Sequence, residues 1–404
     1  MRASKVRGGT ASEIDVNGGL DSVAVRPLAT SRAAAMRPGA RALPEHTRSH
    51  NRALVLQALY RGDGLSRADL AREVGLTRVT ISDLVAELID EDLAVELGRR
   101  PDARPGKPAT LLDINRSGFA IIGLDLSFNS AFRGAVTDLD GTILHRAHVD
   151  TTGMTGDEAV AAVTTLVDKL VDSAGAPILG IGVGSPGVVN AEGTVLSAPN
   201  LGWSNVPLQD MLSEHTHLPT QVANDANTAA LAERTFGGSQ GDTMLVRIGR
   251  GVGSGVVISG APVYGSNFAA GEIGHVVVGT DGGERCACNK IGCLETWLAT
   301  PRLEAKLADA STEDERHEIL REAGQRLGIA LAPIVGALNL GEVVLSGPLA
   351  LLDGTLLTGA AETLRDRTMA DFHGDLTLRM TTLGEDIVVL GAVVMVLTGQ
   401  LGVS

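Results

Sequence analysis

The chain has 404 residues, of which 44% are hydrophobic and 20% are charged, so it is neither a disordered nor a fibrous chain. Its length allows two or three domains with separate cores. The net charge of −14 is unevenly spread: residues 1–115 carry 17 basic and 15 acidic side chains, whereas residues 116–404 carry 17 and 33. A near-neutral head on an acidic body leaves the head able to approach a polyanion.

The sequence shows no clear pattern for secretion, for membrane insertion or for disulfide bonds. No apolar run follows the basic residues near the N-terminus, and the apolar stretch Ile387–Leu397 is interrupted by glycine and too short to span a bilayer. Three cysteines do not suggest a disulfide framework. We therefore expect a cytoplasmic protein without a membrane partner.

The N-terminal segment differs from the rest of the chain in its amino-acid composition. Residues 1–45 are rich in Ala, Arg, Gly and Ser and show no sustained hydrophobic period. Such a segment buries little apolar surface, so we expect a disordered tail. A basic arm that touches DNA phosphates is the alternative.

Residues 46–115 are predicted to form one compact unit. Ser66 and Asp69 have the spacing of a reciprocal helix cap, and Thr77 can cap the next helix after a short turn at Gly75. Two helices joined by such a turn, followed by a hairpin, are typical of a winged helix-turn-helix. The expected elements are helices over Asn51–Arg61, from Ser66 to Gly75 and from Thr77 onwards, and strands over Ala94–Leu97 and Ala109–Ile114.

The third helix has one apolar stripe, formed by Ile81, Leu84, Val85 and Leu88. Burial of this stripe leaves the opposite face near the helix N-terminus for base edges and phosphates, and the basic hairpin tip suits backbone contact. A three-helix bundle that binds a protein is the alternative. Acidic residues at the helix end must point away from phosphate. The predicted DNA-binding residues are Arg78, Val79, Thr80, Ser82, Arg99, Arg100, Arg104 and Lys107.

From Phe119 onwards, strands and helices alternate, which predicts an α/β body. Glycine-rich strands over Thr243–Gly260 start a second lobe after Phe236. We expect one domain over residues 118–404, with a first lobe of about 118–236 plus a C-terminal helix and a second lobe of about 237–385. Further expected elements are strands over Phe119–Leu126, Phe132–Asp138, Thr142–His148 and Ile178–Gly184, and a helix over Asp157–Ser173.

The most specific pattern is a histidine followed by the three cysteines of the chain. His275 precedes Cys286 by 11 positions, and Cys288 and Cys293 follow. Three thiolates and one imidazole complete a tetrahedral zinc site and leave no open position, so the zinc is expected to be structural. Incidental buried cysteines are the alternative.

Polar residues near this pattern suggest a ligand that carries hydroxyl groups. Glu272 and Glu295 flank the metal motif, and carboxylates accept hydrogen bonds from vicinal hydroxyls. His275 can use one ring nitrogen for zinc and the other for the ligand. Asn224 and Asp225 lie between a predicted strand and helix, where a helix cap is the simpler interpretation.

With these motifs, the body from about Ile121 to Val396 resembles the ROK family (repressors, open reading frames, kinases), and the winged helix makes residues 50–404 similar to its sugar-responsive repressor branch. The resemblance implies an actin-like fold of two α/β lobes around a cleft. It also implies that His275, Cys286, Cys288 and Cys293 hold zinc. The residues implied to contact sugar are Asn224, Asp225, Glu272, His275, Glu295, Gly187 and Asn200.

The resemblance leaves two functions open, a sugar kinase and a sugar sensor. Kinases of the family use the aspartate at position 225 as general base and hold ATP phosphates on glycine-rich loops. Here the first loop, residues 125–129, reads Asp-Leu-Ser-Phe-Asn instead of Asp-x-Gly-Gly-Thr. Arg250 replaces the usual threonine of the second loop, and the third reads Ser-Gly-Pro over residues 346–348. These departures favour a sensor in which Asp225 is a vestigial base position and no catalytic residue remains.

We therefore predict a transcription regulator, a repressor in the first instance, that controls carbohydrate metabolism genes. Its expected partners are operator DNA and a sugar or sugar phosphate effector, and a homodimer or homotetramer is expected because such regulators bind paired half-sites. An ATP-dependent sugar kinase with an appended DNA-binding domain is the first alternative. A regulator that responds to a partner protein is the second.

Overall fold

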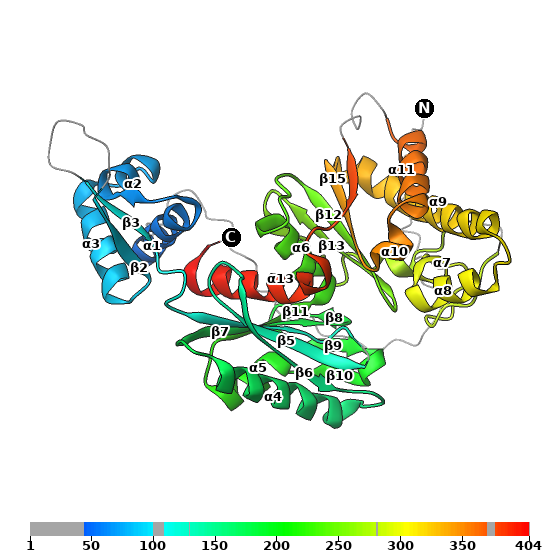
Figure 1. The fold of residues 1–404 in the computed structure, drawn as a ribbon, viewed down its shortest axis with the longest axis horizontal. Helices are drawn as coiled ribbons and strands as arrows, with labels where there is room; N and C mark the ends of the chain where they lie inside the picture. The colour runs from blue at the N-terminus through cyan, green and yellow to red at the C-terminus, as the bar shows by residue number, and fades with distance from the viewer. Residues whose placement is uncertain (1–43, 100–108, 129, 280–281, 370–375, 404) are drawn as a thin grey trace, which may run out of the picture. The chain divides into compact units, whose positions relative to one another are not determined.

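The computed structural model describes residues 44–99, 109–128, 130–279, 282–369 and 376–403, and the described residues from Arg48 onwards form one compact unit (Figure 1). All but the last two residues of the predicted N-terminal tail lie outside the described residues. The predicted basic tip of the hairpin, which includes Arg100, Arg104 and Lys107, also lies outside them.

The N-terminal elements fold as predicted around two helix caps. Ser66 and Asp69 form the reciprocal cap, and the Thr77 side chain accepts a hydrogen bond from the Thr80 amide. Gly75, between the two helices, has a φ of +71°, which favours glycine. The first helix begins at Pro44 rather than Asn51, since polar residues without an apolar period extend it. The elements are α1 (Pro44–Arg61), β1 (Leu65–Ser66), α2 (Arg67–Glu73), α3 (Arg78–Asp90), β2 (Ala94–Arg99) and β3 (Thr110–Ile114), with sheet order β1-β3-β2.

The body contains two sheets of the same topology. In each, the first three strands form an antiparallel meander, and the last two lie parallel to the first strand, which gives the order 3-2-1-4-5 twice. This repeat is that of the actin-like fold, and the predicted α/β class is confirmed. The first sheet consists of β4 (Ala120–Asp125), β5 (Ala131–Thr137), β6 (Ile143–Asp150), β7 (Ile178–Ser185) and β11 (Thr220–Asn224). The second consists of β12 (Thr243–Ile248), β13 (Val252–Ile258), β14 (Ala261–Pro262), β15 (Glu342–Ser346) and β16 (Thr377–Met380).

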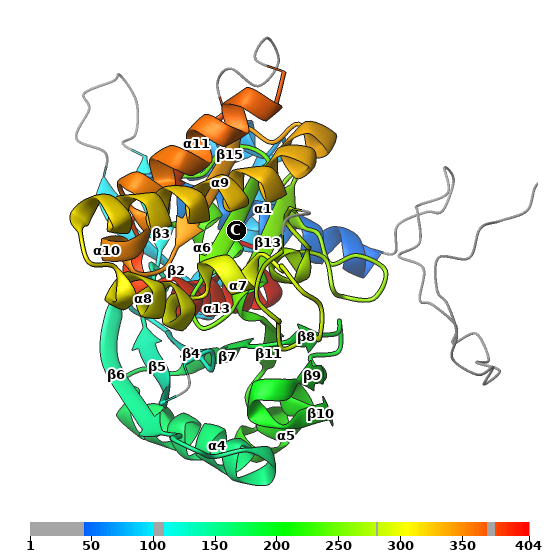
Figure 2. The same ribbon diagram turned by 90° about the vertical axis from the view of Figure 1, so that its right-hand side faces the viewer.

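Helices cover both faces of each sheet. Figure 1 shows the first sheet between α4 and α5 on one side and α13 on the other. In Figure 2 the long helices α9 and α11 run side by side, and they pack together against the second sheet. A small antiparallel sheet of β8, β9 and β10, absent from the sequence prediction because its strands are so short, lies beside the first. The other α-helices and strands of the described residues are α4 (Gly156–Ser173), β8 (Val188–Val189), β9 (Val195–Ala198), β10 (Trp203–Val206), α5 (Leu208–Thr216), α6 (Asp225–Thr235), α7 (Glu295–Leu298), α8 (Thr300–Asp309), α9 (Glu313–Leu338), α10 (Leu349–Leu352), α11 (Thr355–Arg367) and α13 (Ile387–Val396). Four further short helical segments in this described part of the chain are η1 (Pro199–Leu201), η2 (Ile273–His275), η3 (Gly384–Asp386) and η4 (Leu397–Leu401).

Helix α13 is apolar on every side because it is covered on every side. It packs on β4 and β7 and against α6. The approach is so close that a Cβ atom added at Gly391 would lie 1.9 Å from the Thr228 carbonyl oxygen. Its helical run, Gly384–Leu401, is by length and composition able to cross a membrane, contrary to the expectation from Ile387–Leu397 alone, but 61% of this run is buried in the protein.

The chain beyond α13 enters the core of the N-terminal unit. Leu397, Leu401 and Val403 are buried in one cluster with apolar residues of α1, α3 and β3. The Tyr60 hydroxyl, on α1, donates a hydrogen bond to the Leu139 carbonyl oxygen of the body (2.9 Å). The N-terminal helices and the segment that follows α13 therefore share one hydrophobic core.

Candidate functional site

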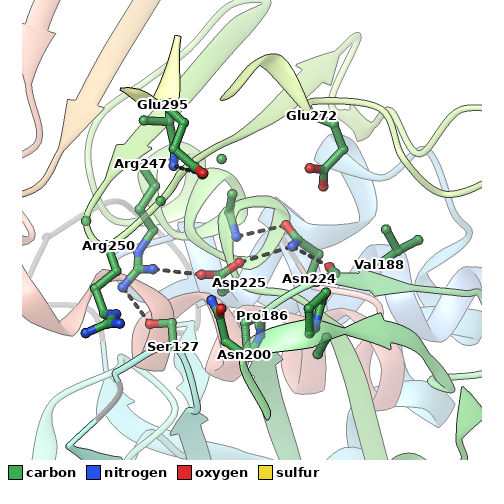
Figure 3. Close-up of a pocket in the computed structure, with 18 of the residues that line it drawn as sticks. Ser127, Pro186, Val188, Asn200, Asn224, Asp225, Arg247, Arg250, Glu272 and Glu295 are labelled. Atoms are coloured by element: carbon green, nitrogen blue, oxygen red, sulfur yellow. Dashed lines mark hydrogen bonds and ion pairs between the residues drawn. The ribbon is translucent and has the colours of Figure 1, made fainter. Parts of the chain in front are cut away.

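The carboxyl ends of β4, β7 and β11 open onto a pocket of about 490 Å³. Loops after parallel strands commonly form ligand sites in α/β folds. The pocket also receives residues from the β12–β13 loop and from the segment around the cysteines, and Figure 3 shows several of its side chains. All seven residues implied to contact sugar line it: Gly187, Asn200, Asn224, Asp225, Glu272, His275 and Glu295.

Asn224 is the N-cap of α6 and fixes the base of the pocket. Its Oδ1 accepts hydrogen bonds from the amides of Ala226 (3.0 Å) and Asn227 (3.1 Å). Its Nδ2 donates to the Gly187 carbonyl oxygen (2.8 Å) and to Asp225 Oδ1 (3.1 Å). The amide group therefore uses its donors and acceptor within the protein, so the cap interpretation of Asn224 holds, and sugar contact by this residue stays a prediction.

Asp225 begins α6 at the floor of the pocket. Burial raises the pKa of Asp225, the neighbouring charge of Arg247 lowers it, and Asp125 raises it again. Its Oδ2 accepts a hydrogen bond from Arg247 Nη1 at 2.7 Å, an ion pair drawn in Figure 3. Sequence reasoning missed Arg247, which sits in an apolar strand and belongs to no recognisable motif.

Two glutamates contribute to the upper wall of the pocket. The Glu272 carboxylate points into the pocket in Figure 3. Burial raises the pKa of Glu272, and the negative charges of Asp225 and Glu295 add to the rise, whereas His275 lowers it. Glu295 Oε2 accepts a hydrogen bond from the Val252 amide (3.2 Å) and so lies against the β12–β13 loop. This wall offers hydrogen-bond acceptors, which is what a polyhydroxylated ligand requires.

The predicted metal ligands gather behind that wall. The ligand atoms of His275, Cys286, Cys288 and Cys293 all lie within 4.8 Å of one another. The His275 Nδ1 to Cys286 Sγ distance and the Cys288 Sγ to Cys293 Sγ distance are both 3.5 Å. Bond lengths of about 2.0–2.3 Å place tetrahedral ligand atoms about 3.5–3.8 Å apart, so the cluster fits a metal ion.

The described residues of the loop after β4 are held by hydrogen bonds within the loop and by ring contacts with two arginines. Ser127 donates hydrogen bonds to Asp125 Oδ1 from its amide (2.9 Å) and its hydroxyl (2.5 Å). The Arg133 guanidinium lies 3.8 Å from the centroid of the Phe128 ring, and that of Arg247 lies 5.9 Å from it. Arg250 lines the same pocket.

The predicted DNA-contact residues on α3 lie opposite the buried stripe. Arg78 and Ser82 are exposed, and Val79 is 72% exposed, whereas Thr80 is half-buried. The Ser82 hydroxyl donates to the Arg78 carbonyl oxygen (2.9 Å). Arg99 ends β2, and its side chain lies outside what the structure describes.

Two acidic residues near the end of α3 are paired with arginines of α1. Glu87 forms an ion pair with Arg48. Glu91 accepts hydrogen bonds from both terminal nitrogens of Arg52, at 3.0 Å and 2.5 Å. These arginines offset the repulsion that the two carboxylates would exert on a nearby phosphate.

The fold and the pocket define a two-lobed protein of the actin-like class, and comparison with known proteins gives the family. Residues 121–398 match the ROK family. The chain is 29% identical over 386 residues to the xylose repressor of Caldicellulosiruptor bescii, covering 87% of this chain and 96% of the repressor. It is 30% identical over 302 residues to the glucokinase of Halalkalibacterium halodurans, covering 63% of this chain and 92% of the kinase. A solved ROK family transcriptional regulator, a homologue of the E. coli MLC protein, shares the fold with a TM-score of 0.78 at 24% identity, covering 88% of this chain and 98% of that one. The chain therefore belongs to the ROK family.

The role of Asn224 can be separated into two parts by substitution. Asn224→Ala removes the cap of α6 and the donor to Gly187, and we expect the free energy of unfolding to fall by about 1–2 kcal/mol. Asn224→Ser keeps a capping oxygen and should recover part of that loss. Urea unfolding measures both differences. An Ala variant as stable as the wild type would show that the cap contributes nothing.

Proposed function

We propose that this protein is a sugar-responsive transcriptional regulator of carbohydrate metabolism genes, acting in the cytoplasm as a repressor. Residues 46–115 are the DNA-binding domain and residues 118–404 the sugar-binding domain. The observation that carries the proposal is the convergence of the seven candidate sugar ligands in one pocket, in a chain whose N-terminal elements have the order of a winged helix. The similarity to the xylose repressor over almost its whole length supports it.

In this proposal the pocket binds the effector through acceptors. Asp225, Glu272 and Glu295 accept hydrogen bonds from vicinal hydroxyls, and Asn200 adds an amide at the opposite wall. His275 presents the ring nitrogen that does not face the cysteines. Gly187 lets the ligand approach the backbone closely. A side chain is excluded there because φ is +85° and an added Cβ atom would lie 2.0 Å from the Ser197 carbonyl oxygen.

The alternative is a sugar kinase, which the glucokinase relative favours. Several features count against it. The glycines that bring a backbone close to phosphate are absent from the loop after β4, and Phe128 fills that loop beneath Arg133. The Oδ2 atom of Asp225 already accepts a hydrogen bond from Arg247 Nη1, so this oxygen is not free to take a proton from a sugar hydroxyl. We therefore propose that the pocket retains sugar binding without phosphoryl transfer.

We also propose that the metal ion is zinc and that its role is structural. Three sulfurs and one imidazole are the donor set of closed tetrahedral zinc sites, with no position left for substrate. Burial, together with hydrogen bonds to the other two thiols, raises the pKa of Cys293 to about 12, so a thiolate there needs a cation. Bound zinc would supply that charge and anchor the imidazole of His275, which orients its other nitrogen.

DNA binding is assigned to α3 and the hairpin that follows. Arg78, Val79, Thr80 and Ser82 would meet the major groove, and Arg99, Arg100, Arg104 and Lys107 the adjacent backbone. Two copies of the chain would read paired half-sites, as a homodimer or homotetramer. The effector would change operator affinity by favouring one arrangement of the lobes.

The sugar assignment is tested with Glu272→Gln. A thermal-shift screen of neutral sugars, amino sugars and sugar phosphates identifies the effector, and calorimetry then measures its affinity. Loss of a charged acceptor should weaken binding by about ten- to a hundredfold. Glu304→Gln, on the exposed face of α8, serves as the matched control. If no sugar stabilises the protein, but the protein consumes ATP when one of the sugars is added, the kinase alternative replaces the proposal.

The DNA assignment is tested with Arg78→Ala in a gel-shift titration on an operator selected from random sequence. Loss of a base or phosphate contact should cost about 1–3 kcal/mol of binding free energy. Arg365→Ala, exposed on α11, removes the same charge elsewhere and should leave the affinity unchanged. Equal affinities of the Arg78 variant and the wild type would contradict the assignment.

The zinc assignment is tested by metal analysis of the purified chain. The wild type should carry about one zinc per chain, and Cys288→Ser should lose most of it, because a structural site needs all four ligands. Lys290→Ala changes an exposed neighbour and should retain the ion. A folded Cys288 variant with a full complement of zinc would rule out this ligand set.

A further inference from the structure

Arg247 reaches from the second lobe to three groups of the first lobe at the floor of the pocket. It extends from β12 of the second sheet, and its side chain is only 19% exposed. Nη1 donates to Asp225 Oδ2 and Nη2 donates to Ser127 Oγ, both at 2.7 Å. Nη2 also lies 3.6 Å from Asp125 Oδ2 in the first lobe.

Asp125 makes this cation necessary. Its side chain is 1% exposed, and its Oδ2 is a buried atom without a hydrogen-bond partner among the described residues. Its other oxygen is occupied by Ser127. A buried carboxylate next to a second carboxylate is costly unless a cation faces both. The Arg247 guanidinium is the group that faces Asp125 and Asp225 together.

We propose that Arg247 is a positioning residue, a built-in cation that clasps the two lobes and holds Asp225 as a fixed acceptor for an uncharged sugar. Nη1 and Nη2 each donate to an acceptor of the first lobe, and the guanidinium charge faces two carboxylates, which weakens its attraction for a phosphate. The rest of the ligand-facing wall carries Glu272 and Glu295, whose charges repel an anion. The preference for an uncharged sugar rests on the proposed function; the clasp does not.

The clasp predicts a change in the sign of a mutational effect. In the wild type, Asp225→Asn removes one partner of the ion pair and should lower the melting temperature. In Arg247→Met, the same change removes an uncompensated buried charge and should raise it. Such a double-mutant cycle isolates the coupling between two residues. An Asp225→Asn effect of the same sign and size in both backgrounds would overturn the clasp.

The pH profile separates charge pairing from packing of the arginine stem. The charged groups that face Asp225 are Arg247 from β12, Asp125 from the end of β4 and Glu272 from the segment before His275. Without Arg247, the folded-state pKa of Asp225 rises further above its ordinary value of 3.8. The folded state then keeps a proton that the unfolded state releases, so stability falls as pH rises from about 4 through the new folded pKa.

The Arg247→Met protein should therefore approach wild-type stability at low pH and fall below it at neutral pH. Arg247→Lys restores a cation and should recover much of the neutral-pH stability, which also covers the case in which the Met variant does not fold. Arg365→Met, exposed on α11, removes the same charge away from the pocket and should leave the pH profile of stability unchanged. A loss of stability in Arg247→Met that is independent of pH, or a Lys variant no better than Met, would identify a packing role instead.

The ligand preference is tested by calorimetry with matched neutral sugars and their 6-phosphates. The wild type should bind the neutral sugar more tightly by about tenfold or more, about 1.4 kcal/mol, and Arg247→Met should lose affinity for it. Tighter binding of the phosphate would contradict the preference while leaving the stability cycle intact. Absence of binding by either compound would count against the proposed function and against the preference, with the clasp judged by the cycle alone.

Discussion

Repulsion between carboxylates is the constraint that the pocket and its surroundings have to satisfy. Asp125, Asp225, Glu272 and Glu295 converge on one small volume, and each acidic group close to the next raises the cost of ionising both. The fold supplies a hydrogen-bond donor to three of them, and the Arg247 guanidinium faces two. Asp225 faces a guanidinium, Asp125 accepts hydrogen bonds from the loop that follows it, and Glu295 accepts one from a backbone amide.

A buried carboxylate is also paired with cationic and hydroxyl groups away from the pocket, where α6 packs against the second sheet. Glu233, fully buried on α6, accepts hydrogen bonds from Arg379 (2.7 Å) and from the Thr381 hydroxyl (2.6 Å). Arg379 also pairs with Glu342 (2.7 Å). Helix α6 is therefore tied to the second sheet at Glu233 and to the pocket at Asp225, its first residue. A ligand that shifts the position of Asp225 therefore acts on α6, a helix that contacts both lobes.

Helix α13 provides a physical connection from that element to the N-terminal unit. It packs against α6 and the first sheet, and the chain beyond it is buried in the core that includes α1 and α3. Two of its neighbours, Gly182 and Thr228, leave no room for added volume: a Cβ at Gly182 would lie 2.1 Å from the Ala392 carbonyl oxygen. A tightly packed helix moves as a rigid body, so a displacement of α13 next to α6 also displaces its end next to the N-terminal helices.

The sequence predicted the features that depend on interactions between residues close together in the chain. The Ser66 and Thr77 caps involve residues three apart, and the cysteine cluster spans a short segment, so spacing alone was informative. Arg247 escaped prediction because its partners lie 22 and 120 positions away, and only the fold brings them together. The small sheet of β8, β9 and β10 was missed because a two- to four-residue strand has no readable period. The full helical run through α13 was missed because Gly384, Gly391 and Gly399 interrupt its apolar pattern, whereas tertiary packing sustains it.

We propose that sugar binding and operator binding are coupled within one chain. The direct measurement is the operator dissociation constant with and without saturating effector, together with the effector dissociation constant with and without saturating operator. Coupling requires both constants to change by the same factor, which we expect to be about 5- to 150-fold. An effector that binds tightly yet leaves operator affinity unchanged would contradict the account.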